Sequence, residues 1–216
     1  MRIRSFIVAY TLVLAILLFA EHRPDPGRQD RYSHIVDLTD AQNSNGPRTT
    51  SASDSRTRII SPADLIPGTW GAGQIPAERL IAPLVVLDLN PSRENASPIS
   101  LDDLAAWESS HGAVPQGAVV AIRRGSSQSS KALPITADAA QFLMDARYTL
   151  GFAIETSANL SSDRTLARQI ALHGNYVVEG TASLALLPQT GSLVIVAPAK
   201  NGNAAQAPVR VLAMVR

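Results

Sequence analysis

The sequence predicts an α/β domain built around a mixed β-sheet, and three observations lead to this fold class. The chain has 216 residues, of which 45% are apolar, enough for one domain with a sizeable core. From Leu84 onward, short aliphatic runs alternate with amphipathic segments of helical period, which is typical of strands alternating with helices. The last two aliphatic runs flank the turn-rich segment 200–203, which indicates an antiparallel hairpin with a long loop.

The first predicted strand–helix–strand unit begins with the continuous aliphatic run 84–87, as expected for a strand buried on both faces. Ser100 is a favourable N-cap, and two aspartates follow it in the first turn, where the helix dipole favours acidic groups. Gly112 supplies a stop for this helix. Residues 118–122 are predicted to form the next strand because they are again aliphatic throughout.

The remaining elements follow the same alternation. Thr136 is predicted to start a second helix, and a third is expected to begin near Ser162, with Leu166 and Ile170 facing inward. Its end is expected at the His-Gly pair 173–174, because glycine commonly terminates helices. Further strands are predicted at 150–154, 176–178, 193–196 and 209–215.

The first 20 residues have the layout of a secretory signal. Arg2 and Arg4 precede an apolar run at 6–20 that ends in the small residue Ala20. A helix of this length covers roughly 22 Å, less than the ~30 Å hydrocarbon core of a bilayer. We therefore expect a cleaved signal, with an uncleaved membrane anchor or a buried amino-terminal helix as alternatives. Either of the first two interpretations exports the folded part, to the periplasm or extracellular space or tethered to the membrane through 6–20.

Residues 21–56 are predicted to be a polar tether, since most of this segment carries too little apolar surface to offset the entropy of ordering it. The strand-like stretch at about 35–38 interrupts it and is expected to dock on the domain. The predicted organisation is therefore a signal or anchor at 1–20, the tether at 21–56, and an α/β domain at 57–216.

Composition excludes several function classes. A net charge of +1 gives no reason to expect nucleic acid or an anionic membrane surface as a partner. The absence of cysteine rules out disulfides, thiolate metal sites and a cysteine nucleophile. His111 and His173 are each expected near a helix end, where a cation suits the dipole. The sequence contains no H-E-x-x-H, G-x-S-x-G or P-loop motif.

Residues 54–64 resemble the H-x-G-T-H-x-D-x-P-x-H signature of the kynurenine formamidase/cyclase-like family of metal-dependent hydrolases. Thr57 and Pro62 occupy matching positions. Six further blocks resemble the family in the same order, at 35–39, 75–88, 118–125, 151–157, 176–188 and 208–213. The resemblance implies the family fold, a swivelling β/β/α domain that is usually dimeric.

In the family, the motif and a later glutamate hold one or two divalent ions, Zn or Mn, which activate water for amide hydrolysis of arylformamidase type. Here the ligand positions are mostly replaced. The resemblance places Asp54 and Arg58 at the first two histidine positions, Ile60 at the aspartate and Asp64 at the last histidine. Glu179 stands at the position of the family glutamate.

Arg58 is the decisive replacement, because a guanidinium has donors and no lone pair and cannot bind a metal. Our hypothesis is that Arg58 substitutes for the ion and pairs with Glu179 and with Asp54 or Asp64. If the pair is buried, breaking it should cost roughly 3–5 kcal/mol. Two alternatives remain: ordinary surface charges on an irregular loop, or a carboxylate site of Asp54, Asp64 and Glu179 that takes Mg²⁺ or Ca²⁺.

The predicted function is that of an exported pseudoenzyme of this family. It would lack a cofactor, form a homodimer, and have a binding or structural role toward a small-molecule ligand that the sequence does not name. The alternative is an active amidohydrolase of arylformamidase type, acting on N-formylkynurenine-like amides in tryptophan catabolism through a non-standard or carboxylate metal site. A third possibility is a membrane-anchored scaffold in which the amino-terminal segment matters most.

Overall fold

The computed structural model describes residues 32–40, 57–88, 97–123, 133–155, 164–200 and 203–216. The predicted signal or anchor and most of the predicted tether lie outside these ranges. The strands are β1 (His34–Asp37), β2 (Arg58–Ile60), β3 (Ile81–Asp88), β4 (Val119–Arg123), β5 (Gly151–Ile154), β6 (Tyr176–Glu179), β7 (Ser192–Pro198) and β8 (Gln206–Val215). The α-helices are α2 (Leu101–His111), α3 (Ala137–Arg147) and α4 (Arg164–Leu172). Short 3₁₀ helices are η2 (Pro62–Asp64), η3 (Ala72–Gln74), η4 (Ala77–Arg79) and η6 (Leu184–Leu186).

The strands form one sheet in the order β1-β8-β2-β6-β5-β4-β3-β7, and β8 also pairs with β7. This additional pairing closes the sheet from β8 round to β7 into a barrel-like ring, with β1 beside β8. Closure removes most of the open sheet edges that would otherwise expose unpaired backbone groups. The predicted fold class, a mixed sheet with helices in the manner of the cyclase-like domain, is confirmed.

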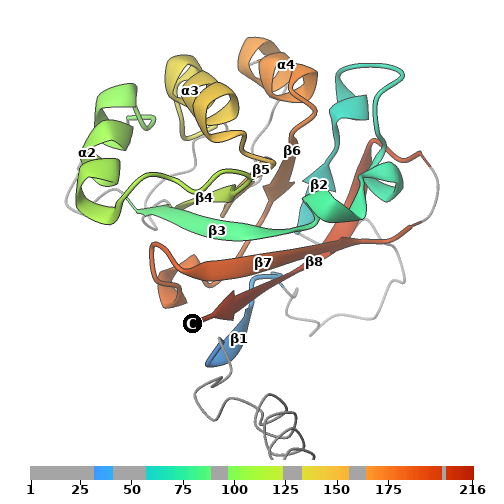
Figure 1. Cartoon of the computed structure of the whole chain (residues 1–216). Helices are drawn as coiled ribbons and strands as arrows, with labels where there is room; N and C mark the ends of the chain where they lie inside the picture. The colour runs from blue at the N-terminus through green and yellow to red at the C-terminus, as the bar shows by residue number, and fades with distance from the viewer. Residues whose placement is uncertain (1–31, 41–56, 89–96, 124–132, 156–163, 201–202) are drawn as a thin grey trace, which may run out of the picture. The chain divides into compact units, whose positions relative to one another are not determined.

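One half of the ring is parallel, and the three α-helices cover it. Strands β3, β4, β5 and β6 pair in chain order, all in parallel. Helices α2, α3 and α4 connect them in turn and lie together on one face of these strands (Figure 1). This is the repeated crossover that parallel neighbours require, since a tight hairpin cannot join them.

The other half of the ring is antiparallel. β7 pairs with both β3 and β8, and β2 pairs with both β8 and β6. β1 adds to β8 in antiparallel register. The β7–β8 pairing confirms the predicted hairpin around 200–203, with longer strands than the sequence indicated. Arg58 lies in the short strand β2, which joins the two halves of the ring. The alternative that placed Arg58 on an irregular loop is therefore wrong.

The sheet separates two hydrophobic cores. One lies between the strands and the helices and includes Leu87, Ile122, Leu143 and Ile170. The other fills the ring and includes Leu38, Ile59, Val86, Val194 and Val211. Alternate residues of β3, β4, β5 and β6 therefore enter different cores, which is why β3 and β4 carry unbroken aliphatic runs in the sequence.

Local signals set the helix ends where the sequence predicted them. The Ser100 hydroxyl accepts from the Asp103 amide, and the Asp103 carboxylate accepts from the Ser100 amide, so the pair forms a capping box. Gly112 ends α2 with a φ of 86°, and Thr136 precedes α3. Within the described ranges, none of the helices has the length and apolar character needed to cross a bilayer.

Candidate functional site

Two strands bring the central residues of the predicted site together. β2 lies antiparallel to β6, and the register places Arg58 directly opposite Glu179. β2 stays in place because Ile59 enters the core inside the ring, while Ile60 enters the core beneath the helices. The local fold thus fixes Arg58 at the end of β6 that carries Glu179.

The two side chains form an ion pair with unequal burial. The Arg58 Nε lies 3.7 Å from the Glu179 Oε2, and the side chains are 47% and 1% exposed, respectively. The Glu179 Oε1 is buried and has no hydrogen-bond partner among the described residues. Among the described residues, the ion pair that balances the charge of Glu179 is therefore the one with Arg58, whose guanidinium is also reached by water.

Burial dominates the acidity of Glu179. It raises the pKa of this carboxyl to about 7, the positive charge of Arg58 opposes the shift, and the negative charge of Asp64 adds to it. Because a buried carboxylate loses its hydration, the neutral acid is favoured over the ion. The carboxyl thus changes protonation state close to neutral pH.

Thr57 and Pro62, the motif residues that match the family signature, have structural positions. The Thr57 hydroxyl donates to the Gly180 carbonyl at 2.6 Å and accepts from the Asp40 amide at 2.7 Å. This fully buried side chain ties the chain after β1, the start of β2 and the end of β6 to one another. Pro62 is buried at the start of η2, where a proline fits.

The other predicted site residues have separate surroundings. Asp64 lies in η2, and its Oδ1 accepts from the Gln206 Nε2 at 3.0 Å. Ile60 is part of the core between sheet and helices. Asp54 lies outside the described residues. Arg58 and Glu179 therefore lie together. Asp64 lies close enough to raise the pKa of Glu179, and Ile60 packs in the core.

The described residues do not fit the divalent ion that the family uses. A zinc or manganese site needs imidazole or carboxylate lone pairs converging on one point. Of the described replacements, Arg58 and Ile60 offer none, which leaves Asp64 alone among them with a carboxylate. In the described part of the chain, histidine, aspartate and glutamate nowhere gather in a group of three or more suited to a metal. A bound cation would also face the fixed charge of Arg58 beside Glu179.

A second buried polar cluster, not found by sequence reasoning, lies at the opposite end of β6. Arg79 of η4 donates through Nη2 to the Gly174 carbonyl and to the Asn175 Oδ1, both at 3.0 Å. Its Cζ also lies over the Trp70 ring, 5.4 Å from the ring centroid, while its buried Nε has no hydrogen-bond partner among the described residues. The Tyr176 hydroxyl donates to the Arg79 carbonyl at 2.9 Å. Burial raises the pKa of Tyr176 and lowers that of Arg79.

The two carboxy-terminal histidines have structural contacts, as expected from their positions near helix ends. The His111 ring stacks on Trp107 and bonds to the Trp107 carbonyl through Nδ1. His173 lies between the Gln169 carbonyl and the Asp145 carboxylate. Both rings thus stabilise helix ends.

Comparison with known proteins places the chain in a family. No curated protein matches it. Isatin hydrolase A from Labrenzia aggregata bound to benzyl benzoate is 26% identical, with a TM-score of 0.67 over 84% of this chain and 93% of that one. Isatin hydrolase A from Ralstonia solanacearum is 22% identical, with a TM-score of 0.68 over 85% and 92%.

A structure described as a potential metal-dependent hydrolase with cyclase activity is 20% identical, with a TM-score of 0.63 over 85% of this chain and 98% of that one. The two structures that are 22% and 20% identical support the fold alone. The Cyclase family model, described as "Putative cyclase", matches residues 27–159. Since this match spans more than half of the sequence, the chain belongs to the cyclase family.

Proposed function

We propose that this chain is an exported, catalytically impaired member of the cyclase family, a pseudoenzyme that acts as a homodimer in a binding or structural role. The observation that carries the proposal is the position of Arg58 directly opposite the buried Glu179, with 3.7 Å between Nε and Oε2. By the family motif, both positions belong to the metal site. A guanidinium there supplies positive charge but no ligand.

The retained motif residues support the same proposal. The Thr57 hydroxyl joins the chain after β1, the start of β2 and the end of β6, and Pro62 is buried at the start of η2, so both have structural roles. The positions that bind the ion in the family now carry a guanidinium, an aliphatic side chain and a hydrogen-bonded carboxylate. Architecture is kept while the ligand set is replaced, which is the pattern expected after loss of metal-dependent chemistry.

Export is proposed on the sequence of the amino terminus. Arg2, Arg4 and the apolar run at 6–20 have the layout of a secretory signal or a short membrane anchor. The folded part would act in the periplasm or outside the cell, free or tethered to the membrane.

One observation favours a second candidate, an active amide hydrolase of the arylformamidase or isatin hydrolase type. Burial raises the pKa of Glu179 to about 7, and its Oε1 has no partner among the described residues. A carboxyl group that titrates near neutral pH is suited to proton transfer. In this alternative, Asp54, Asp64 and Glu179 form the carboxylate metal site, and Glu179 can also exchange a proton near neutral pH.

Metal content separates the two candidates. The protein lacking residues 1–20 is incubated with zinc, manganese and magnesium, freed of unbound metal and analysed by elemental mass spectrometry. We expect less than about a tenth of an ion per chain, since metal affinity needs a nearly complete ligand set. Near-stoichiometric metal, with hydrolysis of N-formylkynurenine or isatin, would establish the second candidate instead.

A matched variant tests whether Arg58 and Ile60 are the cause. The double substitution Arg58→His and Ile60→Asp restores two ligand types of the family motif at their own positions. If the motif assignment is right, this variant gains metal relative to the parent chain. Arg58→Lys, which keeps the charge and adds no usable ligand while protonated, serves as the control and should stay free of metal.

A further inference from the structure

The polar cluster around Arg79, at the amino end of β6, carries a positive charge that lacks an acidic partner. Among the residues that the structure describes, Arg79 takes part in none of the ion pairs. Burial lowers the pKa of Arg79, and Tyr176 is the one described group whose charge acts on it. The guanidinium is half-buried, so water hydrates its charge only in part. The cluster therefore lacks a negative group within the described part of the chain.

The same cluster contains buried donors that have no acceptor. One nitrogen of the guanidinium, Nη2, lies 3.0, 3.0 and 3.5 Å from the Gly174 carbonyl, the Asn175 Oδ1 and the Leu150 carbonyl. The buried Arg79 Nε and the buried Asn175 Nδ2 have no hydrogen-bond partner in the described ranges. Asn175 is 3% exposed, so bulk water does not serve its amide. Because unpaired buried donors cost free energy, these two donors indicate a missing acceptor.

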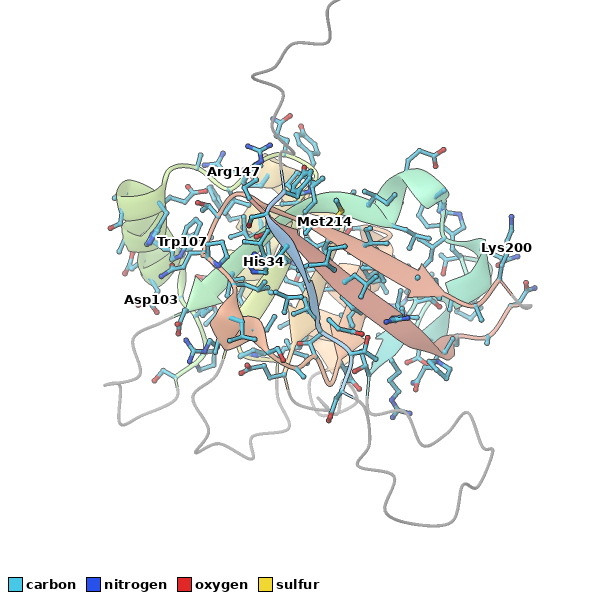
Figure 2. All side chains as sticks on the ribbon, turned by 90° about the horizontal axis from the view of Figure 1, so that it is seen from below. His34, Asp103, Trp107, Arg147, Lys200 and Met214 are labelled. Carbon is cyan, nitrogen blue, oxygen red and sulfur yellow. The ribbon has the colours of Figure 1, made fainter. Side chains whose placement is uncertain are left out.

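The cluster lies near the surface, at an end of the molecule that does not repel anions. The Trp70 ring, which faces the guanidinium, is 38% exposed. The β7–β8 turn is hydrogen-bonded to η3, and Figure 2 shows the exposed Lys200 at this end of the molecule. Lys200 offsets the exposed carboxylate of Glu78 on η4. The unbalanced charge that remains is that of Arg79.

Charge and size restrict the missing partner. A monovalent anion neutralises the guanidinium, whereas a divalent anion would leave an uncompensated negative charge in a half-buried site. The two donors are buried, so a bulky anion does not reach them. A water molecule would pair with the donors but would leave the charge of Arg79 unbalanced.

We propose that the Arg79 cluster binds one small monovalent anion, chloride or a compact carboxylate such as formate, which accepts from the Arg79 Nε and the Asn175 Nδ2. The two donors belong to groups in direct contact, since the Nη2 of one lies 3.0 Å from the Oδ1 of the other. Hydrogen bonds to an ionised acceptor are stronger than neutral ones, so the anion completes the network that joins η4 to β6. This site lies at the opposite end of β6 from Glu179, and it is independent of the proposed function.

The test is the thermal stability of the full chain at constant ionic strength, with sodium gluconate replaced stepwise by chloride or by formate. Gluconate is also monovalent but is too large for the site. For an ion as small as formate, the tightest dissociation constant expected is about 0.5 mM, so ~100 mM should approach saturation. We expect the unfolding temperature to rise by at least about 3 °C and then to level off. In NMR spectra, the signals of the Arg79 Nε and the Asn175 Nδ2 should shift over the same range of concentration.

Asn175→Asp is the deciding variant. It keeps the oxygen that accepts from Arg79 and places a negative charge inside the cluster, where the anion would bind. The folded variant should no longer respond to chloride or formate. Gln141→Glu, which adds the same charge at an exposed position of α3, is the matched control and should respond like the parent chain. Arg79→Lys removes the Nε donor and should raise the dissociation constant at least about 10-fold.

Two results would overturn the proposal. One is a parent chain that unfolds at the same temperature in gluconate, chloride and formate, which would leave water as the acceptor. The other is a folded Asn175→Asp variant that responds as strongly as the parent, because the anion would then act elsewhere. If Asn175→Asp does not fold, the NMR signal of the Arg79 Nε in the parent chain decides. A signal that stays unchanged at saturating anion would equally overturn the proposal.

Discussion

The two ends of β6 each hold an arginine beside a buried polar side chain, and the two arginines have partners of different kinds. Arg79, at the amino end, donates to neutral acceptors: the Gly174 carbonyl and the Asn175 amide oxygen. Arg58, at the carboxyl end, faces the buried carboxyl of Glu179 across 3.7 Å and is itself half exposed. One site is a network of hydrogen bonds and the other is an interaction of charges.

This difference separates the residues that maintain the fold from those available for chemistry. The Arg79 network contains only acceptors that keep the same charge between pH 5 and 8, so its contribution to stability should be constant there. The Arg58–Glu179 interaction changes as Glu179 ionises, since burial raises the pKa of that carboxyl to about 7. The carboxyl end of β6 is thus expected to respond to pH, while the amino end of the same strand is not.

The largest expected effect is at the amino end of β6. Arg79→Met keeps much of the apolar stem but removes the donors to Gly174 and Asn175. We expect the free energy of unfolding to fall by about 4 kcal/mol, because buried acceptors lose a charged donor. Urea denaturation at pH 5 and pH 8 measures this, and the loss should be the same at both.

Arg79→Lys is the control for charge. A lysine keeps the positive charge but cannot reproduce the guanidinium geometry or its stacking on Trp70. It should lose an intermediate amount of stability. A loss below about 1 kcal/mol for Arg79→Met would mean that water replaces the guanidinium without cost, and the distinction between the two ends would fail.

The next effect is at the carboxyl end and depends on pH. The pKa of Glu179 rises from 4.5 to about 7 on folding, so between these values the folded protein binds more protons than the unfolded chain. Stability should therefore fall as pH rises through this window. Glu179→Gln removes the titration. It should match the parent near pH 4 and exceed its unfolding free energy by at most about 3 kcal/mol at pH 8.

Unfolding curves of the parent and Glu179→Gln between pH 4 and 8 test this directly. Other carboxyl groups titrate in both proteins, so the difference between the two curves isolates Glu179. Parallel curves would show that Glu179 ionises as easily in the folded protein as in the unfolded chain. In that case, solvent or an additional partner would have to stabilise its charge.

The elements with strong local signals could be predicted from the sequence. The aliphatic run of β3 reflects burial on both faces, and the capping box at Ser100 fixes the start of α2 without help from distant residues. The pairing of Arg58 with Glu179 could also be anticipated, because the family motif assigns both positions to one site. This prediction depended on the family resemblance, because Arg58 and Glu179 are far apart along the chain.

The elements that depend on distant partners could not be predicted. β2 has three residues, too few for a periodic pattern, and it exists because β6 and β8 pair with both of its edges. The Arg79 network uses a backbone carbonyl and an amide, which leave no recognisable signature in the sequence. The apolar outer face of β1, β8, β7 and β3 appears only once the register aligns single apolar residues from these four strands.

The smallest expected effect comes from Arg58. Arg58→Met removes the positive charge opposite Glu179, so the pKa of Glu179 should rise further. A fully buried pair would cost several kcal/mol to break, but Arg58 is half exposed and 3.7 Å away. We therefore expect a loss of about 1 kcal/mol at pH 8, discounted for solvent screening, and almost none at pH 5, where Glu179 is largely neutral. In the Glu179→Gln background, the same substitution should have no effect at either pH. A loss equal at pH 5 and pH 8 would instead assign Arg58 a packing role and remove the electrostatic contrast between the two ends of β6.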